Sequence, residues 1–534
     1  MKKIAAALLA ALMLSGCSSK ALPELSSPAT TPPHTETFSV PESTPEHVGK
    51  TSYQSRFGNI TEISLSDDEV LADSDAVTLS NDIIYYEDLE AYASGNPYGE
   101  GTLEERHTAE EAALHTVVNI TKPGAYRVTG KLSAGQIRVD LGENACKEED
   151  AVVELILQDA DITCTVAPAI LFLNTYECDG NWSAETARAD VDTTAAGANL
   201  ILEGSNTVSG SHVAKIFKDK DGEKKLWKQD AAIYSYMSMN VYGPGSLELT
   251  ADNEGLDTEL HLTINGGNIH IDSGNDGINT NEDGVSVTTI NDGNVIINAG
   301  LGKEGDGIDS NGYLVINGGT VVAAANPAGD AGLDSDLGSY INGGTVIAMG
   351  STMNWAESDS RQVTMNLQFS GQQKAGSKIT VAKEDGTEVF SFDTAGKHAR
   401  GYSGLVLSHA SLTQGETYHV YIDGVQMGFT GTDVGRGHGG KGRPGGKRFP
   451  EGEMPEGMEL PEDFDPSQFT GQMPDQENRV PPEAFDGERP ERKEPPENWD
   501  PNHFFDKQNS TTGEIQTEFY MNDKVNAFSG VTAA

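Results

Sequence analysis

Positive charge is scarce in this chain. Its 534 residues hold 36 Lys and Arg against 82 Asp and Glu, which gives a formal net charge of −46 at pH 7. A chain this acidic repels nucleic acid and anionic lipid headgroups, so we expect no nucleic-acid partner. The same excess of negative charge favours bound cations, and partners that are neutral or bridged to the protein by cations.

The apolar run near the N-terminus, residues 4–14, is too short to span a bilayer. Lys2 and Lys3 precede it, an arrangement typical of an export signal. Leu14-Ser15-Gly16-Cys17 then resembles the bacterial lipobox, in which the cysteine carries lipid. We predict a lipoprotein signal peptide at 1–17, with Cys17 lipidated and an ordinary cleaved signal as the alternative. This predicts an exported protein, held by its lipid at the extracellular face of the bacterial cell envelope.

Cysteine is scarce as well. Beyond Cys17 the chain holds only Cys146, Cys164 and Cys178, and three is an odd number for a disulfide framework. Their spacing matches no zinc site. We assign these thiols to the core, or to partial pairing, and give them no function.

Glycine is abundant, and much of it stands in an internal repeat. Four similar phrases, which place Asp or Asn two residues after Gly, start at Asn253, Asn275, Gly305 and Asp330. A second phrase, Ile-Asn followed by Gly-Gly or Asp-Gly, starts at Ile264, Ile290, Ile316 and Ile341. These isoleucines lie 26, 26 and 25 residues apart. A repeat of this length, built from short β segments and Gly/Asn turns, is typical of a β-solenoid.

Composition divides the chain around this repeat and predicts an all-β fold. Alternating apolar residues typical of strands begin near Ile120. Twelve of the 23 prolines lie in residues 444–501, a segment too polar to order itself. The predicted regions are a Ser/Thr/Pro linker at 18–50, an N-terminal cap at 51–119, a parallel β-helix at 120–350, a C-terminal β cap at 351–434, a disordered tail at 435–513 and a possible terminal strand at 514–534.

A solenoid stacks equivalent residues about 4.8 Å apart. Two apolar columns then point inward, namely Leu256, Ile278, Ile308 and Leu333, and Ile264, Ile290, Ile316 and Ile341. A polar column, which we call the asparagine ladder, consists of Asn265, Asn291, Asn317 and Asn342. We predict that the ladder amides bond to one another along the stack and that their role is structural.

A second polar column is acidic. Between residues 251 and 350, 15 Asp and Glu stand against a single Lys or Arg, Lys303, so no Arg neutralises the stack. Carboxylates about 5 Å apart repel by roughly 1 kcal/mol even in water. A hard cation with oxygen ligands relieves this repulsion, and flexible coordination by six to eight oxygens favours Ca²⁺ over Mg²⁺.

The predicted ligands, which we call the acidic column, are Glu254, Asp257, Asp276, Asn279, Asp306, Asp309, Asp330, Asp334 and Asp336. The alternative is that these residues cap turns through Asx hydrogen bonds that face water.

Two polar insertions, residues 174–198 and 215–229, interrupt the predicted strands, and the second is rich in lysine. Insertions leave a solenoid as loops, often on its binding face. We favour plain solvated loops for both.

Several phrases together carry a resemblance to a known family. They are Ala-Tyr-Arg-Val-Thr-Gly at 125–130, Ala-Ala-Ile-Tyr-Ser at 231–235, the Asp-Gly-Ile-Asp and Ile-Asn-Gly-Gly-Thr phrases, and Gly-Glu-Thr-Tyr-His-Val-Tyr at 415–421. In their order and spacing, residues 120–424 resemble the carbohydrate-binding-domain-containing family of bacterial surface proteins, whose fold is similar to that of pectate lyases. The resemblance implies a right-handed single-stranded parallel β-helix, bound Ca²⁺, and affinity for cellulose-like or uronic-acid polysaccharide.

The favoured function is binding of polysaccharide by a monomeric lipoprotein without catalysis. A Ca²⁺ column would bridge the acidic protein to an acidic glycan, and exposed aromatic rings would stack on sugar faces. The candidate rings are Tyr234, Tyr236, Tyr242, Tyr313, Tyr340 and Trp355.

Three alternatives remain open. A Ca²⁺-dependent polysaccharide lyase would need Lys303 as its base, but the nearby carboxylates favour the charged ammonium, which is a poor base. A glycoside hydrolase needs paired carboxylates, and Asn279-Thr280-Asn281 lacks the acid of the Asn-Thr-Asp motif of polygalacturonases. The last alternative is a purely structural surface spacer.

Overall fold

The computed structural model describes residues 53–86, 106–180, 183–213, 216–218, 224–226, 228–351, 354–394, 400–434 and 514–534. All of these residues belong to one compact unit, Phe38–Ala534. The predicted signal peptide with Cys17, the 18–50 linker and the 435–513 tail lie outside the described residues. In the part of the chain that is described, no helix is both long and apolar enough to cross a membrane.

The described residues form an all-β fold with large parallel sheets, as the sequence predicts. One sheet has seven strands that pair in parallel, each strand with the equivalent strand of the next repeat. In spatial order these are β4 (Thr116–Ile120), β6 (Gly135–Asp140), β8 (Ile170–Asn174), β13 (Ala231–Ser235), β16 (Glu254–Thr258), β19 (Ile278–Thr280) and β22 (Ile308–Ser310).

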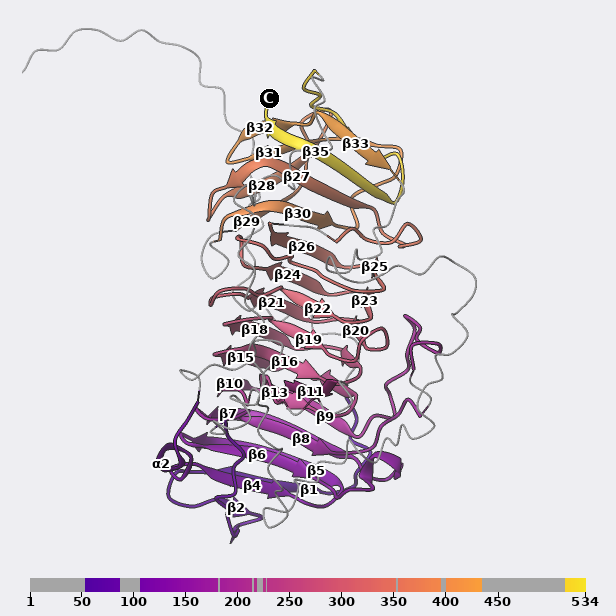
Figure 1. The fold of residues 1–534 in the computed structure, drawn as a ribbon. Helices are drawn as coiled ribbons and strands as arrows, with labels where there is room; N and C mark the ends of the chain where they lie inside the picture. The colour runs from indigo at the N-terminus through magenta and orange to yellow at the C-terminus, as the bar shows by residue number, and fades with distance from the viewer. Residues whose placement is uncertain are drawn as a thin grey trace, which may run out of the picture. The chain divides into compact units, whose positions relative to one another are not determined.

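Two further runs of parallel strands accompany this sheet, and the labels of the second run climb in chain order in Figure 1. The first run is β1 (Ile60–Leu65), β5 (Gly124–Leu132), β7 (Val153–Thr163), β9 (Ala198–Glu203), β14 (Met239–Tyr242), β17 (Leu262–Ile264), β20 (Val287–Ile290), β23 (Tyr313–Ile316) and β25 (Gly338–Ile341). The second run, whose first strand also pairs with the end of β7, is β10 (Ser205–Gly210), β15 (Ser246–Ala251), β18 (Asn268–Ser273), β21 (Asn294–Asn298), β24 (Thr320–Ala324) and β26 (Thr345–Gly350).

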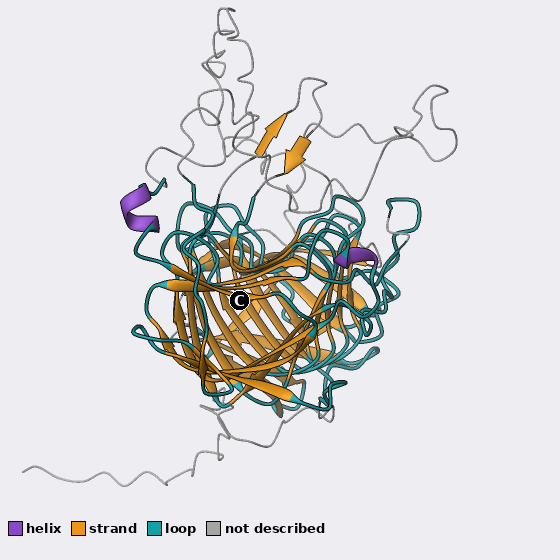
Figure 2. Cartoon of the chain, turned by 90° about the horizontal axis from the view of Figure 1, so that it is seen from below, coloured by secondary structure: helices purple, strands orange, loops and turns teal. Residues whose placement is uncertain are grey.

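The core lies between these strands, and Figure 2 shows the loops outside them. Both predicted apolar columns are buried, and none of their eight side chains is more than 2% exposed. Burying one Leu or Ile side chain contributes about 1.5–3 kcal/mol. We call one copy of the repeat, with its short strands, a rung. Because every rung adds such residues to the same cluster, hydrophobic burial holds the rungs together.

The asparagine ladder is confirmed. Asn291 Nδ2 donates to Asn265 Oδ1, Asn317 Nδ2 to Asn291 Oδ1, and Asn342 Nδ2 to Asn317 Oδ1, each at 2.9 Å. Each ladder residue follows the last residue of its strand, so the amides fix the turn that leaves the sheet.

Short elements surround the first rungs. A single-turn helix, α2 (Ala109–Ala112), begins at a capping box in which Thr108 and Glu111 bond each other's backbone N–H. The remaining elements here are β2 (Leu71–Ala72), β3 (Asp75–Ala76), the 3₁₀ turn η1 (Ala145–Lys147) and an antiparallel pair in the second insertion, β11 (Ile216–Lys218) with β12 (Lys224–Leu226).

After β26 the pairing becomes largely antiparallel. The strands are β27 (Thr364–Gln373), β28 (Lys378–Lys383), β29 (Glu388–Asp393), β30 (Tyr402–Ser408), β31 (Thr417–Ile422), β32 (Val425–Gly428), β33 (Gly431–Val434), β34 (Phe519–Tyr520) and β35 (Val525–Ala533). β30 pairs with β26, and a separate apolar cluster fills this part. These strands therefore cover the open edge of β26, which would otherwise expose unpaired backbone groups.

Candidate functional site

Three members of the acidic column, Asp257, Asn279 and Asp309, lie on β16, β19 and β22, which succeed one another in Figure 1. Asp257 pairs with Asn279, and Asn279 with Asp309, in direct parallel register. An isolated bridge from Ile308 to Leu333 places Asp334 on the next rung. The register predicted from the repeat is therefore correct.

Three aspartates of the acidic column accept backbone N–H groups from a neighbouring rung. Asp306 donates its backbone N–H to Asp276 Oδ1 at 2.6 Å, and Ala331 donates its N–H to Asp306 Oδ1 at 2.5 Å. Gly305 donates its N–H to Asp330 Oδ2 at 2.9 Å. These carboxylates thus tie adjacent rungs together. Such bonds run between rungs, so they differ from the alternative of Asx hydrogen bonds that cap turns and face water. Asp334 accepts from its neighbour Ser335 at 2.8 Å, and Asp336 is exposed.

A buried polar network joins the first two acidic rungs. Asn279 Nδ2 donates to Glu254 Oε1 at 3.2 Å, and Asn281 Nδ2 lies 2.9 Å from both carboxylate oxygens of Asp257. Glu254 Oε2 and Asn279 Oδ1 are buried and receive no hydrogen bond from the described residues. An unsatisfied buried oxygen is costly, so Glu254 Oε2 is suited to accept a proton or a cation, and the amide oxygen Asn279 Oδ1 is suited to accept a cation.

The upstream end of the column carries groups that the repeat does not reveal. Lys228, only 7% exposed, places its Nζ 2.8 Å from Oδ2 of Asp230. Tyr234 donates its hydroxyl to Glu259 Oε1. The prediction that no basic side chain neutralises the stack is wrong at this end, because Lys228 comes from the insertion at 215–229 rather than from a repeat. The same residue shows that this insertion is not wholly a solvated loop.

Burial and mutual repulsion shift the acidity of the column. Burial and the carboxylate of Glu254 raise the pKa of Asp257 well above its usual value. Burial and Asp309 do the same for the pKa of Asp276. Burial and Asp334 raise the pKa of Asp306 to about 8, and burial with Asp334 and Asp336 raises the pKa of Asp309 to about 7. Without a cation, the folded chain therefore keeps protons on these groups near neutral pH.

The donors suit a hard cation in their chemistry, since they are carboxylate and amide oxygens, and two of them are buried and accept no hydrogen bond from the described residues. These donors are not gathered around one point, because each successive rung of the column supplies its own carboxylates. Within the described residues, no three His, Cys, Asp or Glu side chains are grouped so that they could hold a metal ion. A bound ion would need amide or carbonyl oxygens as well, and the metal assignment stays a prediction.

Lys303, the base required by the lyase alternative, is exposed on the turn before Asp306. No ion pair joins it to a described carboxylate at 4.0 Å or less. It shares the turn with exposed Glu304.

The aromatic candidates divide into buried and half-buried rings. Tyr234 is 0% exposed, so the prediction that it stacks on sugar is wrong: its hydroxyl serves Glu259 inside the protein. Tyr236 packs edge-on against Tyr234, and Tyr242 is half-buried with its ring 4.7 Å from that of Tyr53. These rings are engaged within the chain.

Three half-buried candidates lie further along. Tyr313 and Tyr340 stand on adjacent strands β23 and β25, with ring centroids 6.1 Å apart. Trp355 packs in part against the main core. The role of these rings in sugar binding stays a prediction.

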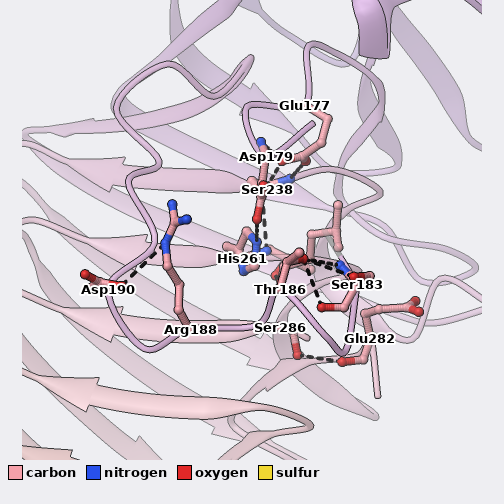
Figure 3. Close-up of polar contacts among 12 residues, drawn as sticks. Glu177, Asp179, Ser183, Thr186, Arg188, Asp190, Ser238, His261, Glu282 and Ser286 are labelled. Atoms are coloured by element: carbon pink, nitrogen blue, oxygen red, sulfur yellow. Dashed lines mark hydrogen bonds and ion pairs between the residues drawn. The ribbon is translucent and has the colours of Figure 1, made fainter. Parts of the chain in front are cut away.

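The insertion at 174–198 is anchored to the sheet through polar contacts, drawn in Figure 3. Ser238 donates its backbone N–H and its hydroxyl to Glu177 at 2.7 and 2.9 Å, and His261 Nε2 lies 3.3 Å from Asp179 Oδ2. Ser238 Oγ meets the backbone N–H of His261 rather than its ring, so the group is not a Ser-His-Asp nucleophile arrangement. The interpretation as a plain solvated loop is wrong for these anchored residues.

Sequence reasoning missed Lys228, Asp230, Glu259 and Asn281. The first two precede β13, which pairs with β16 so that Ala231 faces Glu254. Residues 230–235 are thus a degenerate earlier copy of the repeat, with Tyr234 at the position of Asp257. Aligning that copy would have found Asp230, whereas the approach of Lys228 depends on the path of the insertion.

Comparison with known proteins agrees with the resemblance in the repeat. The family model described as carbohydrate-binding domain-containing protein matches residues 115–395. A protein of the same description from Acetivibrio thermocellus (strain ATCC 27405) is 32% identical over 155 residues, which are 29% of this chain and 44% of that protein. The chain therefore spans less than half the length of this relative.

A solved structure described as the polysaccharide lyase-like protein from C. thermocellum, gadolinium derivative, is 23% identical. The match covers 54% of this chain and 93% of the chain in that structure, with a TM-score of 0.31. The match of the family model extends over more than half of the 534 residues. The chain belongs to the family of carbohydrate-binding domain-containing proteins.

Proposed function

We propose that this protein binds a polysaccharide, cellulose-like or rich in uronic acid, through a right-handed parallel β-helix loaded with Ca²⁺. It acts as a monomer without catalysis, exported and held by a lipid on Cys17 at the extracellular face of a bacterial envelope. The observation that carries the proposal is the acidic column: carboxylates of successive rungs stand in register, partly buried, with raised pKa values.

A cation explains both the column and an acidic ligand. The chain has a net charge of −46, so a uronic-acid polymer is repelled unless cations bridge the two. Ca²⁺ accepts carboxylates from several molecules because its coordination by six to eight oxygens is flexible. Here Asn279 would offer an amide oxygen that accepts no hydrogen bond from the described residues, together with the carboxylates of Asp276 and Asp309 on its own and the next rung. Ring contacts from Tyr313 and Tyr340 would add affinity.

The proposal is tested by retention on insoluble pectate and on cellulose, with Ca²⁺ and with EGTA. We expect EGTA to release the protein from pectate, and the Asp306→Asn/Asp309→Asn variant to lose most of the Ca²⁺-dependent retention. A matched variant, Asp67→Asn, removes a carboxylate that lies outside the repeats and accepts the backbone N–H of Ser133. Retention on both polymers that ignores EGTA would refute the Ca²⁺ bridge.

The same samples separate binding from lyase chemistry. A lyase removes the proton α to the uronate carboxylate and leaves an unsaturated product that absorbs in the ultraviolet. We expect no such absorbance from polygalacturonate with Ca²⁺. Absorbance that appears with the wild type and disappears in Lys303→Ala would replace this proposal with the lyase alternative.

A further inference from the structure

A buried lysine stands at the upstream end of the acidic column. Lys228 is 7% exposed and Asp230, its partner at 2.8 Å, is 4% exposed. Taking an ammonium out of water costs several kcal/mol unless carboxylates surround it. The insertion at 215–229 therefore delivers a positive charge to a place where only negative charge can compensate it.

This place is one rung before the first repeated carboxylate. Ala231 faces Glu254 in the register of β13 and β16, and Glu254 donates its backbone N–H to the carbonyl oxygen of Asp230 at 3.0 Å. Asp230 Oδ1 and Glu254 Oε2 are both buried without a hydrogen-bond partner among the described residues. Two acceptors that lack donors among the described residues thus lie on consecutive rungs, and the Lys228 ammonium pairs with the carboxylate that carries the first of them.

The charge of Lys228 acts on the column beyond its own partner. Burial raises the pKa of Glu254 and of Asp257, and the Lys228 ammonium opposes the rise at both groups. It opposes the rise at Asp309 as well, two rungs further along. The ammonium group of Lys228 therefore compensates part of the negative charge of the column that a metal ion would otherwise compensate.

We propose that Lys228 is a built-in cation that occupies the upstream end of the acidic column and excludes a divalent ion from Asp230, Glu254 and Asp257. Divalent ions are then confined to the downstream rungs of Asp276, Asp306 and Asp309. This inference rests on the proposed Ca²⁺ binding and adds the residue that limits how many ions the column takes. Removing the ammonium converts its position into a further Ca²⁺ site.

The test measures the number and affinity of bound Ca²⁺ by calorimetry and equilibrium dialysis on the full chain. Lys228→Met removes the charge and keeps most of the aliphatic stem. The matched control, Lys303→Met, removes the same charge from an exposed turn. Lys228→Arg keeps the charge at the original position.

We expect Lys228→Met to bind one more Ca²⁺ per chain, or to bind Ca²⁺ at least about tenfold more tightly, because a repulsive charge has left the column. Lys303→Met and Lys228→Arg should match the wild type within about twofold. A Lys228→Met protein that folds only in millimolar Ca²⁺ supports the same conclusion, since the metal then replaces the ammonium.

Two results overturn the inference. One is a Lys228→Met protein with the Ca²⁺ count and affinity of Lys303→Met, and the other is a Lys228→Met protein that Ca²⁺ cannot fold although Lys228→Arg folds. Failure of the proposed function looks different: the wild type then binds no Ca²⁺. In that case a first Ca²⁺ site in Lys228→Met still supports the role of Lys228, and no site in either protein refutes both.

Discussion

The asparagine ladder and the acidic column are both stacks of polar side chains with one residue per rung, but they complete their hydrogen bonds in different ways. An amide carries a donor and an acceptor, so the two inner ladder residues, Asn291 and Asn317, each give one hydrogen bond to one neighbour and take one from the other. The three Nδ2–Oδ1 distances of 2.9 Å show this chain of bonds. Within the ladder the inner amides therefore satisfy one another, and Asn342 Oδ1 at its end accepts the backbone N–H of Arg361 at 3.3 Å.

A carboxylate only accepts, so a stack of carboxylates must obtain its donors elsewhere. This protein uses backbone N–H groups of the next rung at Asp276 and Asp306, an amide at Asp257, and the ammonium of Lys228 at the upstream end. Some oxygens still receive no hydrogen bond from the described residues. With the same rung geometry, a stack of Asn residues is therefore a purely structural element. A stack of Asp or Glu residues needs protons or cations to satisfy its carboxylates.

The largest effect should come from the apolar column beneath both stacks. Ile290, 0% exposed, directly precedes the ladder residue Asn291. We expect Ile290→Ala to lower the free energy of unfolding by about 4 kcal/mol, through lost transfer energy and a cavity. Asn291→Ala should cost about 1 kcal/mol, because water can replace its exposed hydrogen bonds. Equal losses in urea unfolding would show that the ladder, rather than the core, holds the rungs together.

The second prediction concerns pH in the absence of metal. The pKa of Asp306 is raised to about 8 and that of Asp309 to about 7, whereas an unfolded Asp titrates near 3.9. Between these values the folded chain binds more protons than the unfolded chain, so stability falls as pH rises. The stabilisation that comes from these bound protons is fully present below about pH 4 and is lost progressively up to about pH 8.

Allowing for partial solvent exposure, we expect a loss of about 2–3 kcal/mol between pH 5 and pH 8 in EDTA. Thermal unfolding at several pH values measures it, and Asp306→Asn should flatten the slope. The ladder contributes nothing here because amides do not titrate in this range. A melting temperature that rises from pH 5 to pH 8 in EDTA would contradict the raised pKa values.

The third prediction turns one ladder residue into a residue of the acidic type. Asn291→Asp still accepts from Asn317 but no longer donates to Asn265. We expect a loss of about 1 kcal/mol at pH 7, from one broken hydrogen bond at an exposed site. Acid should reverse part of the loss, since the carboxyl group introduced by this substitution can donate again once it is protonated. A loss that is the same at pH 4 and pH 7 would show that the donor role of Asn291 is unimportant.

Sequence alone predicted the parts of this structure that repeat. The period of the Ile-Asn-Gly phrases gave the parallel register, the buried apolar columns and the ladder, because each depends only on which residues recur. What it missed depends on parts of the chain that do not recur. Lys228 belongs to an insertion rather than to a repeat. Tyr234 belongs to a degenerate copy of the repeat in which it is buried, so it donates a hydrogen bond inside the protein instead of stacking on sugar.

The smallest effect should come from the half-buried ring pair Tyr313 and Tyr340, with centroids 6.1 Å apart. Unlike the acidic column, a ring contributes to sugar binding without charge, so its effect should persist in EGTA on a neutral glycan. We expect Tyr313→Ala to weaken binding to cellulose about three- to fivefold, equivalent to about 0.5–1 kcal/mol. Tyr520→Ala is the matched control, since Tyr520 is 50% exposed on β34, outside the repeats. If both variants bind as the wild type does, the Tyr313 ring only packs against Tyr340, and recognition of sugar belongs to the acidic column alone.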